Sequence, residues 1–252
     1  MDEIKISSLN EYIQIVENLS PVYSLSRGQE YDNDLLPTIL RKDDNGMNLY
    51  TKSDAQSFID DFKCNSPLYI ENSMIQNHNE LLVFAQHFGV PTHLLDFTYS
   101  HLVSLMFAVE NAFTYIDDDR NSVVWFLNPS QLNLYSIHRT DLFDLSTEEK
   151  LPSNTEFPIA VSARKNNKRI AAQNGLFVYF QPNGAPLNRL SISDAILYKV
   201  IIPHNVGRKI LKSLFMMGMR FNDLYPELSS VAKDIMLKNN VNEYYKMEEE
   251  ND

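Results

Sequence analysis

The segment from Leu102 to Phe113 constrains the fold most strongly, because it is apolar on nearly every side of a helix. Such a helix is stable in water only when other elements cover it all round. Ser100 stands just before the segment, where its side chain can cap the first helical turn. We therefore predict a helix buried within the fold, with further layers of structure around it.

Other segments divide into helices and strands by the period of their apolar residues. Helical spacing is found after the cap at Ser8, over Thr51–Phe88 with Gly89 behind it, after Asn205 up to Gly218, and from Pro226 onward. Strand patterns cover Val22–Ser26, Leu94–Thr98, Val123–Leu127, Leu176–Phe180 and Ala195–Ile202. This arrangement predicts an α+β fold with a mixed or antiparallel β core and helices in the N-terminal half and at the C-terminus.

The chain of 252 residues is short enough for one core. We predict one domain over residues 1–238 and a disordered acidic tail over residues 239–252, which ends in Glu-Glu-Glu-Asn-Asp. The segment from Gln131 to Thr155 is polar and acidic, and we expect it to be an irregular loop.

The formal net charge of -11 argues against an extended nucleic-acid surface, which needs a basic track along the phosphates. It leaves room for a small basic pocket. No apolar run reaches the ~18 residues of a membrane span, and the polar N-terminus resembles no secretory signal. Together with the single Cys64, these features lead us to expect a cytoplasmic protein that is not attached to a membrane.

Several strong catalytic motifs are missing from the sequence. The chain has only 7 glycines, none in a phosphate-binding loop, and it has no His-Glu-x-x-His or Gly-x-Ser-x-Gly string. No histidine or cysteine spacing predicts a metal site. The candidates that remain are polar residues inside apolar segments, because burial of a polar group costs free energy unless it is paired.

Arg27 is the first candidate, next to Gly28, where the chain can turn or approach a ligand closely. A guanidinium there can hold a phosphate or a carboxylate through two parallel hydrogen bonds. The alternative is a surface arginine at the end of a strand.

His87, Asp96 and Thr98 are the next candidates. His87 ends a predicted helix, where it either binds the last carbonyl groups or faces a pocket. Alternation along Leu94–Thr98 puts Asp96 and Thr98 on one face of a strand, so they either line a cleft together or cap the following helix.

Arg169 and Gln173 lie four residues apart and share one face if their segment is helical. Arg164, Lys165 and Lys168 make this the most basic stretch of an acidic chain. It is either a solvated turn or the basic rim of a pocket for an anionic ligand.

Several of these segments together resemble the FRG domain family of bacteria and phages, which is named for a (Phe/Tyr)-Arg-Gly motif. The matching strings are Ser26-Arg27-Gly28-Gln29, Leu36-Pro37-Thr38 with Arg41, AQHFGVPTHLLDFT over residues 85–98, Leu105–Ala108, RIAAQNGLF over residues 169–177, and Leu224–Leu228. Ser26 departs from the pattern, because the family has an aromatic residue before Arg-Gly.

The chain also has a looser similarity to ADP-ribosyltransferases of the Arg-Ser-Glu type. Arg27-Gly28 resembles their first motif, Phe97–Ser100 the second, and LFVYFQPNG over residues 176–184 the third. This similarity implies a split sheet and NAD as the cofactor. It also implies catalytic roles for Arg27, Asp96 and Gln173.

The nucleotide would then be bound by Arg27, Gly28, Gln29, His87, Thr98 and Arg169. Gln173 stands where these transferases have their catalytic glutamate, and a neutral amide cannot stabilise a cation as a carboxylate does. Either Asp96 takes over that role or the protein binds a nucleotide without transferring ADP-ribose.

Three functions follow as alternatives. The first is an NAD-consuming toxin or antiphage effector that is an ADP-ribosyltransferase or a glycohydrolase. The second is a non-catalytic sensor that recognises a nucleotide signal or a phage protein. The third is a nuclease, for which Asp117-Asp118-Asp119 is the candidate acidic group.

Overall fold

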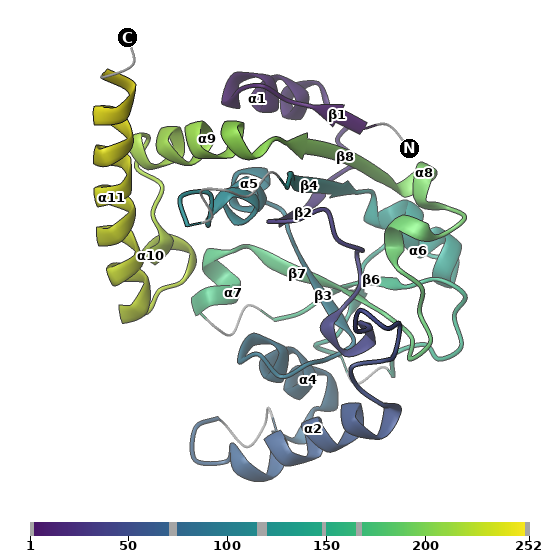
Figure 1. The fold of residues 1–252 in the computed structure, drawn as a ribbon. Coiled ribbons are helices and arrows are strands. Elements are labelled where there is room, and N and C mark those ends of the chain that lie inside the picture. The colour runs from purple at the N-terminus through teal and green to yellow at the C-terminus, as the bar shows by residue number, and fades with distance from the viewer. Residues whose placement is uncertain (1–2, 71–74, 115–119, 148–149, 165–167, 250–252) are drawn as a thin grey trace.

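The structure, a computed structural model, describes residues 3–70, 75–114, 120–147, 150–164 and 168–249 (Figure 1). Their strands form one mixed sheet in the order β1-β8-β4-β2-β3-β7-β6-β5. The strands are β1 Glu3–Lys5, β2 Leu25–Gln29, β3 Leu94–Thr98, β4 Ser122–Leu127, β5 Phe143–Asp144, β6 Ile159–Ser162, β7 Gly175–Tyr179 and β8 Leu197–Ile202. The pairs β1–β8 and β5–β6 are parallel and the other pairs are antiparallel, so the predicted α+β fold with a mixed sheet is confirmed.

The sheet is paired most weakly between β2 and β3. β2 pairs with β4 along its whole length, and β3 pairs with β7 along its whole length. β2 and β3 themselves are paired at one position, Ser26 opposite Thr98. The two halves of the sheet therefore separate on either side of this pair, and space opens between them.

The helices are α1 Leu9–Asn18, α2 Lys52–Asn65, α4 His78–His87, α5 His101–Val109, α6 Pro129–Ile137, α7 Lys168–Ala172, α8 Ser193–Ile196, α9 His204–Met216, α10 Phe221–Leu224 and α11 Leu228–Glu249, with short 3-10 turns η1 Thr38–Leu40 and η2 Leu187–Arg189. None of the described helices is both long enough and apolar enough to cross a membrane.

The predicted buried helix is α5, which packs against β2 and is covered further out by α9. Ser100 caps it as expected, because its hydroxyl oxygen accepts a hydrogen bond from the Val103 amide. Leu105 and Met106 are fully buried in a cluster that also contains Val124 of β4 and Ile210 of α9. α5 is therefore the central helix of this side of the sheet.

A smaller lobe, formed by α2 and α4, lies below the sheet in the view of Figure 1. Within the described part of Thr51–Phe88, α2 and α4 are separate helices, because α2 ends at Asn65 just before Pro67. Gly89, with φ of 86°, ends α4 as the sequence suggested. Leu81 of α4 and Ile59 of α2 pack with Phe177 of β7, which joins the lobe to the sheet.

The expectation for Gln131–Thr155 was wrong, because this segment contains most of α6 and the short strand β5. Asn128 caps α6 and Pro129 occupies its first turn. Asn133 of α6 is fully buried and exchanges hydrogen bonds with the backbone of Ala160 in β6. A polar side chain therefore fixes this helix to the sheet, which the apolar pattern could not reveal.

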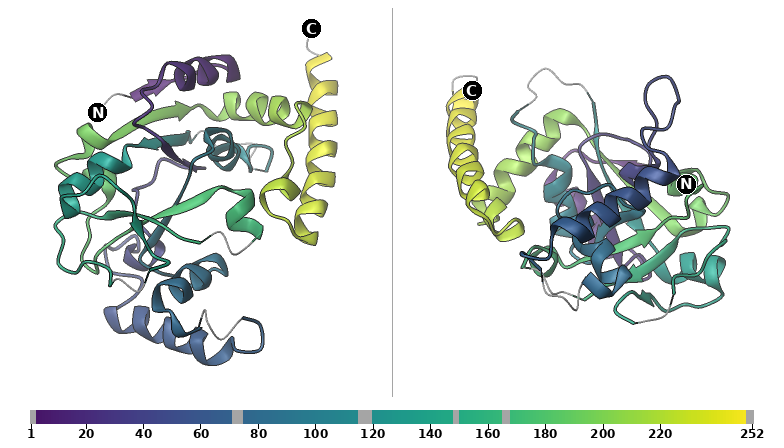
Figure 2. Two further views of the ribbon diagram at one scale, coloured as in Figure 1. Left: turned by 180° about the vertical axis from the view of Figure 1, so that it is seen from behind. Right: turned by 90° about the horizontal axis from the view of Figure 1, so that it is seen from below.

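The expected disordered tail was also wrong for residues 239–249, since α11 continues to Glu249. Leu237 and Val241 are buried against α9 and α10, so tertiary packing holds a helix whose sequence is largely polar. Both views of Figure 2 show α11 standing along the end of α9. Residues 250–252 lie outside the described residues.

Candidate functional site

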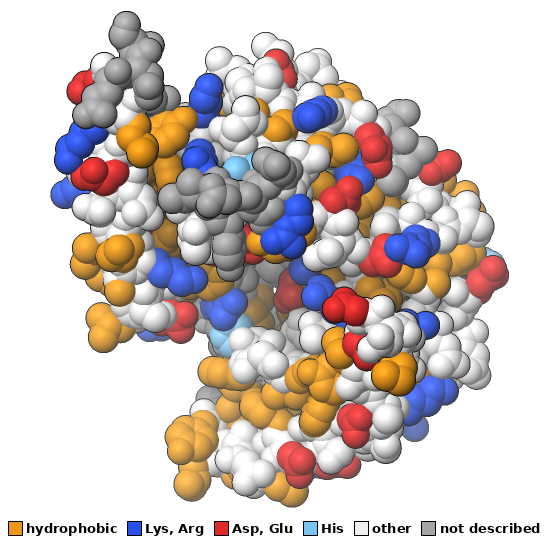
Figure 3. Space-filling model, in the orientation of Figure 1, with side chains coloured by type: hydrophobic (Ala, Val, Ile, Leu, Met, Phe, Trp, Pro, Cys, Tyr) orange, Lys and Arg blue, Asp and Glu red, His pale blue; other side chains and the backbone are white. Residues whose placement is uncertain are grey.

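A cavity of about 400 Å³ opens where the two halves of the sheet separate. β2, β3, α4, α5, α7 and the start of β7 contribute to its walls. Its lining includes all eight residues predicted for the site: Arg27, Gly28, Gln29, His87, Asp96, Thr98, Arg169 and Gln173. Figure 3 shows this face hollowed between the body of the sheet and the α2–α4 lobe, with charged side chains of both signs around the hollow.

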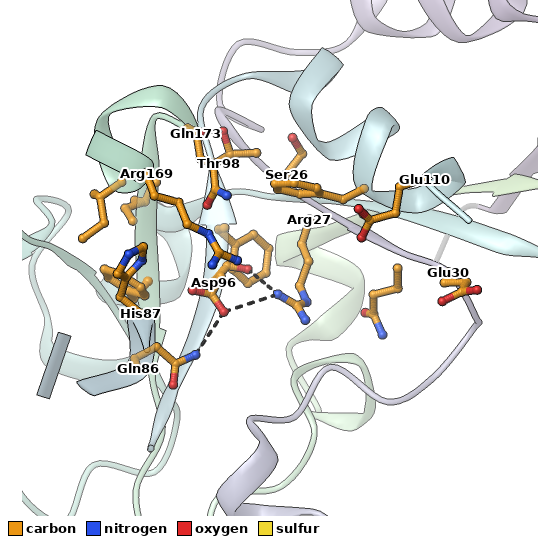
Figure 4. A pocket seen from close by; sticks show the side chains of 18 of the residues that line it. Ser26, Arg27, Glu30, Gln86, His87, Asp96, Thr98, Glu110, Arg169 and Gln173 are labelled. Atoms are coloured by element: carbon orange, nitrogen blue, oxygen red, sulfur yellow. Dashed lines mark hydrogen bonds and ion pairs between the residues drawn. The ribbon is translucent and has the colours of Figure 1, made fainter. Parts of the chain in front are cut away.

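Arg27 stands at the centre of the cavity, between the two acidic sides seen in Figure 4. Its Nη1 donates a hydrogen bond of 2.9 Å to the backbone oxygen of Asp96, and the same nitrogen lies 3.9 Å from Asp96 Oδ2. Its Nε is buried with no hydrogen-bond partner among the described residues. Burial lowers the pKa of Arg27, with a contribution from the nearby charge of Arg41, while Asp96 opposes the shift.

Asp96 is held in place by a chain of side-chain hydrogen bonds. Gln86 Nε2 donates to Asp96 Oδ2 at 3.0 Å, and Thr92 Oγ1 donates to Gln86 Oε1 at 2.6 Å. These bonds orient the carboxylate toward Arg27 (Figure 4). The Asp96 side chain remains 57% exposed, so it can also meet a ligand from the solvent side.

Thr98 and Gln173 hold β3 and β7 together at the cavity. Thr98 Oγ1 donates to the Gln173 backbone oxygen at 2.6 Å and accepts a hydrogen bond from the Ser100 amide. Gln173 Nε2 donates to the backbone oxygen of Leu224 in α10. The Thr98 hydroxyl thus positions the segment that carries Gln173, and it also supports the turn into α5.

His87 and Arg169 form the wall of the cavity on the α4 and α7 side, opposite Arg27 (Figure 4). Burial lowers the pKa of His87, and the positive charge of Arg169 lowers it further, while Asp96 and Glu227 oppose the shift. The Arg169 guanidinium lies 4.6 Å from the centre of the Tyr225 ring, which is a cation–π contact. A neutral imidazole beside a guanidinium can exchange a proton next to a bound anion.

The sequence analysis suggested that Gly28 lets the backbone turn or approach a ligand, and its close approach proves to be to α5. A Cβ atom at Gly28 would lie 1.8 Å from the Ser104 backbone oxygen of α5. The adjacent Ser26 is fully buried and is bound by the Ser104 hydroxyl and by His101 Nδ1, both at 2.8 Å. Ser26 is therefore fixed by polar contacts to α5.

Two further polar atoms of the β2 segment are buried beside Arg27. Gln29 Oε1 and Glu30 Oε1 have no hydrogen-bond partner among the described residues, although Asn111 Nδ2 reaches the other Glu30 oxygen at 3.3 Å. Buried polar atoms in native proteins are normally paired with protein, water or a ligand. With Arg27 Nε, they mark this wall of the cavity as a surface that needs a polar ligand or ordered water.

Five further residues line the cavity that were not predicted as site residues: Glu30, Arg41, Gln86, Glu110 and Tyr225. Glu110 caps the C-terminal end of α5, where the helix dipole disfavours a negative charge. Burial raises its pKa, Glu30 raises it further, and Lys233 and the Tyr225 hydroxyl at 3.5 Å oppose the shift. Its position within the apolar segment Leu102–Phe113 was the available indication, of the same kind that singled out Asp96.

The basic stretch contributes one side chain, Arg169, to the cavity. Arg164 forms an ion pair of 3.3 Å with Glu80 and does not line the cavity. Lys165 and the trio Asp117-Asp118-Asp119 lie outside the described residues. Within the described part of the chain, no three histidine, cysteine or acidic side chains are grouped so that they could hold a metal ion.

Comparison with known proteins gives one family. The model of the FRG domain matches residues 23–116, which include β2, the α2–α4 lobe, β3 and α5. A search of curated proteins and a search of solved structures each gave no match. The matched segment contributes Arg27, Asp96 and Glu110 to the cavity, while Arg169, Gln173 and Tyr225 come from the rest of the chain.

Proposed function

We propose, for a chain that carries an FRG domain over residues 23–116, that the cavity binds a dinucleotide of the NAD type and cleaves its nicotinamide–ribose bond. The observation that carries this proposal is the buried, unpartnered Nε of Arg27 in a cavity with Arg41 and Arg169. Guanidinium groups bind phosphate through paired, charge-assisted hydrogen bonds. A volume of about 400 Å³ lies within the usual range of small-molecule sites, ~300–1,000 Å³.

The sheet order supports the proposal. The three segments that resemble transferase motifs begin or end in β2, β3 and β7, which are neighbours in the sheet. Arg27, Thr98 and Gln173 therefore lie around one cavity although 146 positions separate the first from the last. This neighbourhood is what an NAD site of the Arg-Ser-Glu type requires.

Two carboxylates are available for the chemistry in place of the missing glutamate. Cleavage transfers the electrons of the C1′–N bond to nicotinamide and leaves a positive charge on the ribose. We assign Asp96 to stabilise that charge, because it is oriented by Gln86 and lies beside Arg27. We assign Glu110 to accept the proton of the attacking water or target hydroxyl, since its raised pKa suits a group that exchanges protons.

To test the proposal, the purified protein is incubated with NAD, and the nicotinamide that it releases is measured by chromatography. Arg27→Gln should reduce release about 10- to 100-fold, the loss expected for hydrogen bonds between charged groups. Arg164→Gln, which removes a guanidinium outside the cavity, should retain the rate within about twofold. Absence of both nicotinamide release and dinucleotide binding by calorimetry would refute the proposal.

One observation favours a second candidate, a nucleotide sensor without turnover. Gln173 is neutral and its amide is bound to Leu224, so it cannot supply the charge of a catalytic glutamate. For such a sensor, calorimetry should give one bound ADP-ribose per chain with no nicotinamide release, and Arg27→Gln should abolish binding.

Both candidates suit a toxin or an antiphage protein, the enzyme because loss of NAD stops cellular metabolism and the sensor because it would respond to a nucleotide signal. If the protein is an NAD-consuming enzyme, its expression in bacteria should lower the cellular NAD concentration and slow growth. If it is a sensor, its expression should leave the cellular NAD concentration unchanged. A pull-down with the wild type should then recover a stoichiometric protein partner, and a pull-down with Arg27→Gln should not.

A further inference from the structure

A second cavity, of about 800 Å³, adjoins the first. Asn33 and Arg41 line both cavities, so the two spaces meet at these side chains. The segment after β2, the N-terminal end of α2 and the loop between β7 and η2 supply its walls. None of the predicted site residues lines this second cavity.

Its charge is positive although the chain as a whole carries a net charge of -11. Arg41, Lys42, Lys52 and Arg189 line it, whereas Asp34 is its one lining carboxylate. Asp34 is already paired with Arg189 at 2.7 Å. The cavity therefore retains an excess of positive charge on the side of Arg41 and the two lysines.

Two nearby carboxylates, Asp43 and Asp54, do not line the cavity, and each accepts hydrogen bonds within its own turn. Asp43 Oδ1 accepts hydrogen bonds from the Asn45 and Met47 amides. Asp54 Oδ2 accepts one from the Thr51 amide in the capping box of α2. The first turn of α2 begins at Lys52, so the positive end of this 14-residue helix also lies at the cavity.

The walls are fixed by hydrogen bonds between segments far apart in the sequence. The Leu187 amide donates to the Leu35 backbone oxygen at 3.0 Å, and the Leu35 amide donates to Asn188 Oδ1 at 2.8 Å. Leu40 and Pro186, which are partly exposed, supply apolar surface on which a planar ring can lie. His93 adds a buried Nδ1 with no hydrogen-bond partner among the described residues.

Arg41 connects this cavity to the site described above. Its Nε donates to the Leu36 backbone oxygen at 3.3 Å, which directs the guanidinium along the boundary between the cavities. Its charge is close enough to Arg27 to disfavour the protonated form of that side chain. A bound pyrophosphate between the two guanidinium groups would relieve this repulsion and would leave Lys42 and Lys52 for a further anion.

We infer that the second cavity binds the adenosine half of the dinucleotide and that Lys42 and Lys52 recognise an additional phosphate on it, so that the 2′-phosphorylated form is preferred. This inference rests on the proposed function. The pyrophosphate needs two positive charges, which Arg27 and Arg41 provide. Lys42 and Lys52, which line only the second cavity, then remain available to a third phosphate.

Calorimetry with ADP-ribose and 2′-phospho-ADP-ribose tests the inference. The wild-type chain should bind the phosphorylated ligand about tenfold more tightly at low salt, and this preference should shrink at 0.3 M salt. Lys42→Gln/Lys52→Gln should remove the preference and leave the affinity for ADP-ribose within about threefold. Lys63→Gln/Lys209→Gln, a control on exposed lysines that line neither cavity, should retain it.

The outcomes separate the inference from the proposed function. The inference would be overturned if the wild type bound the two ligands equally, or if Lys42→Gln/Lys52→Gln kept the preference. In either case, loss of ADP-ribose binding in Arg27→Gln would still support the first cavity as the nucleotide site. Failure of both ligands and of NAD to bind would overturn the proposed function and the inference together.

Discussion

The two faces of β2 are packed in opposite ways within one residue of each other. Gly28 faces α5, where no atom larger than hydrogen fits. Arg27 faces the cavity, where its Nε has no partner among the described residues. β2 is thus packed at high density on one side and presents a charged, only partly paired side chain to the cavity on the other.

This difference has a physical reason. A buried guanidinium is costly unless it is paired. Asp96 pairs Arg27 only in part, because the Nε of Arg27 has no partner among the described residues, so contacts of the strand itself must also fix its position. The packing of α5, the Ser26–Ser104 hydrogen bond and the full pairing with β4 supply those contacts. The other edge of β2, paired with β3 at Ser26 alone, is where the sheet opens.

Gly28→Ala should have the largest effect among the changes that test this comparison. Its Cβ would meet the backbone of Ser104 and Ala108, so α5 must move, and we expect a loss of about 3 kcal/mol or more in unfolding free energy. The matched control is Gly175→Ala, where the nearest atom to a Cβ would be 3.8 Å away. Urea denaturation should show a change below about 1 kcal/mol for the control, and equal effects of the two variants would contradict the comparison.

Arg27→Met tests the other face. The substitution removes a buried charge and leaves Asp96, which is exposed enough to be solvated. We therefore expect the unfolding free energy to change by less than about 1 kcal/mol while phosphate-ligand binding is lost. A loss of stability as large as that of Gly28→Ala would mean that Arg27 is a structural residue.

Glu110→Gln should raise stability by about 0.3–1 kcal/mol at neutral pH, since it removes a charge from the unfavourable end of α5. The raised pKa of Glu110 means that the folded chain binds its proton more tightly than the unfolded chain does. The contribution of Glu110 to the free energy of unfolding is therefore fully present below the pKa that this group has in the unfolded chain. It is lost as the pH rises through the pKa that the group has in the folded chain. Urea denaturation from pH 4 to 8 should show the advantage of the variant growing with pH, and a constant difference would exclude this cause.

Arg169→Gln should have the smallest effect, a rise in the pKa of His87. Removal of the guanidinium takes away one of the two causes that lower this pKa and leaves burial in place. Titration of the imidazole by NMR measures the shift directly, with Arg164→Gln as a control that should leave it unchanged. A His87 pKa insensitive to Arg169 would mean that α7 does not face α4 across the cavity.

Much of the fold could be predicted from local patterns. The apolar segment of α5 required burial on all sides, the cap at Ser100 formed as expected, and β3, β4 and β7 follow from their apolar runs. α6 was not predicted, because a buried asparagine fixes it to the sheet. The C-terminal end of α11 was not predicted, because two buried apolar residues hold a helix whose surface is largely polar. The spacing of apolar residues along the sequence indicates neither effect.

The sequence by itself identified candidate polar residues, among them Arg27, Asp96 and Gln173, since a polar group within or beside an apolar run is visible in one dimension. Only the tertiary structure decided that they surround one cavity, because the order β2-β3-β7 brings together segments far apart in the chain. It likewise decided that Glu110 and Arg41 join them and that Gly28 is required by α5. Those properties depend on distances across the fold, which a linear pattern does not contain.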